Sequence, residues 1–271
     1  DYRKLKYLTC QKLGQKFKRE REKVEIMDLK GEWTGEKYAL FNEYLITLSN
    51  EKIKKFSEKL IKTNLKVLGL TNPIIRSIAK DIEKGDPSGF LSIANPTDSY
   101  EINLIYGLVS AHTKDFDLKL SRIENFLNSI DNWASCDVCV GDFKIKQTDE
   151  DKLFEFIEKY IESDKTYHAR AAIVMLMKFF INERFIDKSL ELTKKVKCGE
   201  YYIDMALAWF YAECLGKQPK KSIEFLKSAQ LPQSVLSKTA QKARDSFRVS
   251  KEIKEEITMI SRRKKGMENN G

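Results

Sequence analysis

The stretch "IDNWASCD", residues 130–137, places an aromatic ring and a carboxylate four residues apart. On a helix this spacing puts Trp133 and Asp137 on one face, one turn apart. A carboxylate can stabilise a developing positive charge or orient an attacking water, and an electron-rich ring face favours cations. The alternative is a half-buried Trp beside a solvated Asp with no chemical role.

Two further residues stand out because their surroundings are apolar nearly all round. Arg170 lies near the start of "ARAAIVMLMKFFI", residues 169–181, and Trp209 lies late in "YYIDMALAWFYAECL", residues 201–215. All-round apolarity predicts helices inside a stack, where a charged side chain is costly and a Trp is bulky. The alternatives are a first-turn Arg that reaches solvent and an ordinary core Trp.

Most of the chain has the 3.6-residue period of amphipathic helices. In "KLFEFIEKYIE", residues 152–162, apolar residues form one stripe with charges opposite. Similar stripes cover residues 51–62, 73–84, 98–112, 116–129, 183–196, 217–228 and 233–262. Short links such as "GDPSG" at 85–89 and "NPTDS" at 95–99 separate them, which predicts antiparallel neighbours.

The helix pairs recur at a period of roughly 35–45 residues, near that of HEAT-type repeats. We therefore predict an all-α fold, a right-handed α-solenoid of HEAT-like antiparallel helix pairs with a concave basic face. A compact irregular bundle is the alternative. The expected organisation is a basic helical extension over 1–34, a single domain over 35–262 and a polar tail over 263–271. The preferred interpretation of the extension is a plain solvated helix, and the alternatives are an extra basic helix that lengthens the contact with a partner and upstream sequence.

The 271-residue chain is basic, with 49 Lys and Arg against 40 Asp and Glu and a formal net charge of +9. A basic surface attracts polyanions without sequence preference, so phosphate-bearing partners fit. No apolar run reaches the length of about 18 residues that spans a bilayer. The opening "DYRKLKYLTCQ" has no signal-peptide pattern. We expect a cytoplasmic protein without membrane contact.

Five cysteines, at positions 10, 136, 139, 198 and 214, are odd in number and scattered, which argues against a disulfide framework. Cys136 and Cys139 have the CxxC spacing of metal and redox sites. No second pair follows, and neither His112 nor His168 is spaced as a ligand. We interpret the cysteines as small buried thiols and expect no metal.

Five segments, taken in order, resemble the AlkD-type DNA alkylation repair glycosylases, which are built from HEAT-like repeats. The resemblance runs from about residue 40 to about 250, and the ordered set is more specific than any single motif. The segments are "FSEKLIKTNLKVLGLTNPIIRSIAK" (56–80), "IDNWASCD", "HARAAIVMLMKFF", "YYIDMALAWFYAECL" and "KARDSFRVS" (242–250).

The resemblance implies an enzyme that hydrolyses the N-glycosidic bond of cationic N3- and N7-alkylated purines, such as 3-methyladenine and 7-methylguanine. It implies that duplex DNA is the partner and that no base is flipped into a pocket. Asp137, Trp133 and Trp209 would be catalytic and Arg170 would bind DNA. The expected protein is a monomer that needs no cofactor and no obligatory protein partner. One departure is the family's G-x-R-x-P loop, which reads "GLTNP" at 69–73 and lacks the basic residue.

Two other functions compete with this one. A non-catalytic HEAT-repeat module could bind damaged or distorted DNA, and a protein-binding scaffold could use the same solenoid. A DNA binder needs basic residues, whereas a carboxylate near phosphates would repel them. A scaffold leaves the pairing of Trp133 with Asp137 unexplained, so we favour the enzyme.

Overall fold

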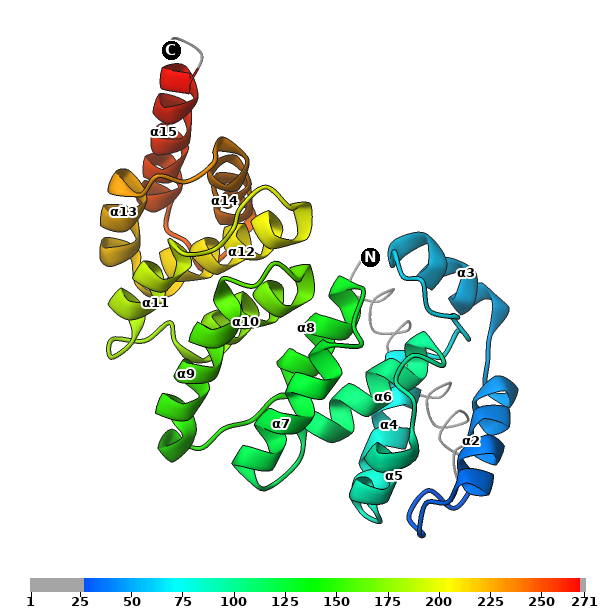
Figure 1. Cartoon of the computed structure of the whole chain (residues 1–271). Helices are drawn as coiled ribbons and strands as arrows, with labels where there is room; N and C mark the ends of the chain where they lie inside the picture. The colour runs from blue at the N-terminus through cyan, green and yellow to red at the C-terminus, as the bar shows by residue number, and fades with distance from the viewer. Residues whose placement is uncertain (1–26, 269–271) are drawn as a thin grey trace, which may run out of the picture. The chain divides into compact units, whose positions relative to one another are not determined.

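The computed structural model describes residues 27–268, which form fourteen α-helices, one short 3₁₀ helix and no strand (Figure 1). The predicted all-α class is confirmed. The chain divides between Lys144 and Ile145 into two compact units, unit 1 and unit 2. A single domain over 35–262 stays a prediction, since repeat domains also contain compact sub-blocks. No helix within residues 27–268 has the length and apolarity needed to span a membrane.

Unit 1 is built around one wholly buried helix, α6, which packs against α4, α5, α7 and α8. Gly107 makes close packing possible, because an added Cβ would lie 2.3 Å from the Cys139 sulfur on α8. The helices of this unit are α2 (Gly35–Thr47), α3 (Glu51–Leu60), α4 (Asn72–Glu83), α5 (Pro87–Ile93), α6 (Tyr100–Ala111), α7 (Phe116–Leu127) and α8 (Trp133–Asp142).

Unit 2 stacks its helices in two rows. One row holds α10, α12 and α14, the other holds α9, α11, α13 and α15, and neighbours in each row are in contact. The two helices predicted to lie inside a stack, α10 and α12, are indeed mostly buried. The elements are η1 (Gln147–Asp149), α9 (Glu150–Ile161), α10 (Thr166–Phe179), α11 (Ile186–Thr193), α12 (Tyr201–Lys217), α13 (Pro219–Ser228), α14 (Gln233–Asp245) and α15 (Lys251–Glu268).

The structure corrects the expected helix pattern in two places. The segment between residues 85 and 99 is more than a link, because it contains α5. Asp86 caps that helix by accepting a hydrogen bond from the Gly89 amide at 2.8 Å, and Pro87 suits the first helical position. The single stripe expected over 233–262 is broken into α14 and α15 by the connection 246–250.

The end of the expected N-terminal extension belongs to the core of unit 1. Leu29 and Trp33 are buried, and the Trp33 ring packs edge-on against Phe41 and Phe90 at centroid distances of 5.3 and 5.0 Å. The rest of the extension, residues 1–26, lies outside the described residues. At the other end, α15 continues to Glu268, past the expected start of the polar tail.

Candidate functional site

Helix α8 presents Trp133 and Asp137 on one face, as the four-residue spacing predicts. Both side chains are half-buried, whereas Cys136 and Cys139 of the same helix are buried. Gly141 continues the exposed face by one more turn, and an added Cβ there would meet nothing within 4 Å. This face of α8 is therefore partly exposed and has space for a further side chain at Gly141.

The N-terminus of α8 is fixed by two polar residues that precede it. The Asn132 side chain caps the helix by accepting a hydrogen bond from the Ser135 amide at 2.8 Å. The Asp131 carboxylate accepts hydrogen bonds from the Thr63 hydroxyl and the Asn64 amide, both at 2.6 Å. These bonds tie the start of α8 to the 63–64 segment and set the direction in which Trp133 projects.

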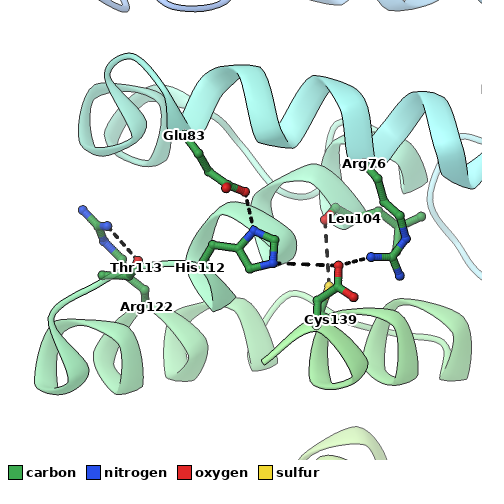
Figure 2. A network of polar contacts seen from close by, with 8 residues as sticks. Arg76, Glu83, Leu104, His112, Thr113, Arg122 and Cys139 are labelled. Atoms are coloured by element: carbon green, nitrogen blue, oxygen red, sulfur yellow. Dashed lines mark hydrogen bonds and ion pairs between the residues drawn. The ribbon is translucent and has the colours of Figure 1, made fainter. Parts of the chain in front are cut away.

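The C-terminus of α8 is fixed by a charged cluster that Figure 2 shows between α4, the end of α6 and α8. Asp142 pairs with Arg76 of α4, and one of its oxygens lies 3.8 Å from Nε2 of His112. The other ring nitrogen of His112 contacts Glu83. Sequence reasoning missed this cluster, because its members come from three helices and have no local pattern.

The "GLTNP" loop before α4 is shaped by a buried carboxylate. Glu101 of α6 is fully buried and accepts hydrogen bonds from the amides of Leu68, Gly69 and Leu70 at 2.9, 2.8 and 3.2 Å. Gly69 has φ +94°, which L side chains rarely adopt. The three hydrogen bonds to Glu101 thus fix the backbone of the loop against α6. Sequence reasoning missed Glu101 because nothing nearby marks it as buried.

In unit 2, Arg170 does not reach freely into solvent, so the first-turn alternative is wrong. Its side chain is buried in α10 with 6% exposure, and Nη1 donates a hydrogen bond to the Tyr202 carbonyl at 2.7 Å. That carbonyl lies in the first turn of α12. The bond joins neighbouring helices of one row and gives the guanidinium a fixed position.

Trp209 is also not the core aromatic of the alternative interpretation. It is half-buried, whereas the next two residues, Phe210 and Tyr211, are fully buried. Trp209 follows Tyr202 by seven positions, so the two side chains share a face of α12 two turns apart. The Arg170 bond therefore lies at the first turn of α12, about two turns before Trp209 along the helix. Trp133 and Asp137 lie in unit 1, and the convergence of all four side chains stays a prediction.

The cysteines of the described residues are buried or half-buried thiols, as expected. Cys136, Cys139 and Cys214 are buried and form no disulfide, and burial raises the pKa of the Cys139 and Cys214 thiols above the usual range. No three His, Cys, Asp or Glu side chains within residues 27–268 gather closely enough to hold a metal ion. Cys10 lies outside the described residues.

A family model described as DNA alkylation repair enzyme matches residues 41–248 of the chain. The chain belongs to this family. The DNA alkylation repair match spans most of both units and includes all four candidate residues. No curated protein and no solved structure matches the chain significantly.

For a DNA alkylation repair enzyme, the two units offer complementary groups. Unit 1 supplies a carboxylate and an aromatic ring on one partly exposed face of α8. Unit 2 supplies a guanidinium and a second partly exposed indole. Carboxylate and ring faces both favour positive charge, and a guanidinium favours phosphate.

Proposed function

We propose that the protein is a DNA glycosylase that hydrolyses the N-glycosidic bond of cationic N3- and N7-alkylpurines in duplex DNA without flipping the base. The observation that carries the proposal is the pair of half-buried residues Trp133 and Asp137 on one partly exposed face of α8. Family membership supports repair of alkylated bases, and the pair supports the reaction at the sugar.

The lesion itself makes the reaction easy. An N3- or N7-alkylated purine is positively charged, so it leaves as a neutral base and needs little acid catalysis. The group that requires stabilisation is the deoxyribose, which becomes oxocarbenium-like as the bond stretches, as in glycoside hydrolysis. Asp137 supplies negative charge to this sugar and orients or deprotonates the water that attacks the anomeric carbon.

The other candidate residues hold the nucleotide in place. Trp133 and Trp209 would lay their ring faces against the deoxyribose and exclude bulk water, which strengthens the action of Asp137. Arg170 cannot offer its whole guanidinium group to a phosphate, because Nη1 donates a hydrogen bond to the Tyr202 carbonyl. Its fixed charge would attract a phosphate that approaches the α12 face.

The test compares the parent chain with Asp137→Asn in single-turnover release of 7-methylguanine or 3-methyladenine from duplex DNA. The parent should release base faster than spontaneous loss. Asp137→Asn keeps the shape of the side chain but removes its charge, so the rate should fall by about 10²- to 10³-fold. DNA affinity should persist or rise, since the removed carboxylate repels phosphate.

A matched control is Asp164→Asn, which removes a surface carboxylate that pairs with Lys197 and is 87% exposed. Its excision rate should equal that of the parent. Equal rates for Asp137→Asn and the parent would remove Asp137 from the mechanism. A parent that binds duplex DNA but releases no cationic alkylpurine would support the non-catalytic binding module instead.

A further inference from the structure

The connection between α14 and α15, residues 246–250, exposes an aromatic side chain completely. Phe247 has a relative exposure of 105%, the highest among the large exposed hydrophobic residues of the described chain. Water contact with a whole phenyl ring is unfavourable unless a partner covers it. Val249, two residues further on, is buried. The loop therefore has one apolar side chain in the core and the other in solvent.

The loop is attached firmly to α12. Arg248 donates a hydrogen bond from Nη1 to Oε2 of Glu213 at 3.1 Å. On the next turn of α12 the loop packs beside Gly216, where an added Cβ would lie at the ordinary contact distance of 3.4 Å from the Arg248 Cβ. The Ser246 hydroxyl accepts a hydrogen bond from the Arg248 amide at 3.2 Å. These contacts fix the residues on both sides of Phe247.

The attachment places the loop beside the candidate site of unit 2. Glu213 follows Trp209 by four residues on α12, so the two side chains share a face one turn apart. Arg248 bonds to Glu213, and Phe247 is its neighbour in the chain. The exposed ring therefore lies near the C-terminal end of the helix face that carries Trp209.

The surroundings of Phe247 are basic. Between residues 238 and 254, six Lys and Arg stand against two acidic residues. The exposed cations of this stretch are Lys238, Arg244, Arg248 and Lys251. An aromatic ring among cations suits nucleic acid, because the cations contact phosphates while the apolar ring packs against sugars and bases.

We propose that Phe247 is a DNA-contacting side chain that packs against sugar and base edges in the minor groove, beyond the nucleotide held at Trp209. The cations of residues 238–254 contact the flanking phosphates. This inference rests on the proposed function, since it takes duplex DNA as the partner. It adds a contact that the four candidate residues do not provide.

The experiment measures the dissociation constant of the full chain for a fluorescent duplex over a series of salt concentrations. Phe247→Ala should weaken binding about tenfold at every salt concentration, in the range known for one aromatic contact to a base. The slope of log affinity against log salt should not change, because phenyl contacts release no counterions. Phe247→Trp should retain affinity, whereas Lys251→Gln should lower the slope by about one.

Leu118→Ala is the matched control, because it shortens an exposed apolar residue of α7 in unit 1 that is 45% exposed. Its affinity should equal that of the parent. The unfolding temperature of Phe247→Ala should also be unchanged, since the ring packs against nothing in the described chain. A Phe247→Ala variant that binds as tightly as the parent would overturn the inference.

Base release by the same proteins separates this inference from the proposed function. If the parent binds DNA through Phe247 but excises nothing, the DNA contact stands and the glycosylase activity fails. If the parent excises and Phe247→Ala binds equally well, only the contact fails. A parent without affinity for duplex DNA overturns both.

Discussion

The two units hold their candidate residues in different ways. In unit 1, Asp137 is half-buried, and the helix that carries it is positioned by other side chains, chiefly Asp131 and Asp142. In unit 2, Arg170 is itself buried and bonds directly to the backbone of α12. If the proposed function holds, the residues that carry the chemistry and those that anchor the helix differ in unit 1, whereas Arg170 has both roles in unit 2.

This difference has a consequence for substitution. Removing the charge of Asp137 should change the reaction with little change in folding, because its helix is held from both ends. Removing Arg170 should change substrate binding and folding together. The anchoring residues of unit 1, in contrast, should affect stability most.

The largest stability effect is expected from Glu101→Gln in unit 1. The Glu101 carboxylate accepts three backbone hydrogen bonds in a fully buried place. Gln has a single acceptor oxygen, and its side-chain NH₂ group would face backbone N–H groups of the loop, which cannot accept a hydrogen bond. We expect the free energy of unfolding to fall by about 3 kcal/mol, as when a buried charged partner is lost. Urea denaturation measures the change.

The control for this substitution is Glu58→Gln, at an exposed position of α3. It should change the free energy of unfolding by less than about 0.5 kcal/mol, as surface substitutions usually do. A fall below about 1 kcal/mol for Glu101→Gln would show that the 68–70 loop keeps its shape without the carboxylate. The contrast between anchoring and chemical residues in unit 1 would then fail.

A smaller effect is expected from Arg170→Lys. Lysine keeps the charge but not the planar fork that reaches the Tyr202 carbonyl. The free energy of unfolding should fall by about 1.5–3 kcal/mol, the usual worth of a hydrogen bond to a charged group. DNA affinity should fall with it. Denaturation and duplex binding are the two measurements.

Arg184→Lys in the same unit is the control, since Arg184 is 53% exposed and pairs with Glu150 and Asp151 at the surface. It should change stability little. If Arg170→Lys weakened DNA binding and left stability untouched, Arg170 would resemble Asp137, and the two units would not differ as proposed.

Much of the fold could be predicted because helix periodicity is a local property. The stripes at 73–84 and 116–129 correspond to α4 and α7, and all-round apolarity correctly marked α10 and α12 as interior helices. The prediction failed where a short capped segment looked like a link, as at α5. It also failed at residues 246–250, where apolar residues continue the period although the helix stops.

The candidate site could be predicted only in part. The spacing of Trp133 and Asp137 gave their shared face, because i and i+4 positions coincide on any helix. Contacts between distant segments could not be read in this way. The bonds of Glu101, Asp131 and Arg170 depend on which helices pack together, and that follows from the whole set of apolar faces.

The smallest expected effect concerns the thiols, which report on the two units separately. Cys198 is half-buried in unit 2, where burial and then Asp204 raise its pKa to about 11. Iodoacetamide should label it slowly at neutral pH, with a rate that rises about tenfold per pH unit toward that value, because the thiolate is the nucleophile. The buried Cys136 and Cys139 of unit 1 should react only when that unit opens.

The raised pKa also fixes the sign of the stability change. The folded state favours the neutral Cys198 thiol. Its contribution to the free energy of unfolding is therefore complete below the usual thiol pKa and is lost as the pH rises through about 11.

Peptide mass spectrometry after timed labelling gives the rate at each cysteine, with Cys198→Ser as the control for peptide assignment. A Cys198 rate that levels off just above the usual thiol pKa would mean an ordinary exposed thiol. Rapid labelling of Cys139 under native conditions would mean that the close packing of α6 on α8 opens readily. Helix α8 would then not be held in a fixed position by its anchoring residues, and the proposed difference between the two units would fail.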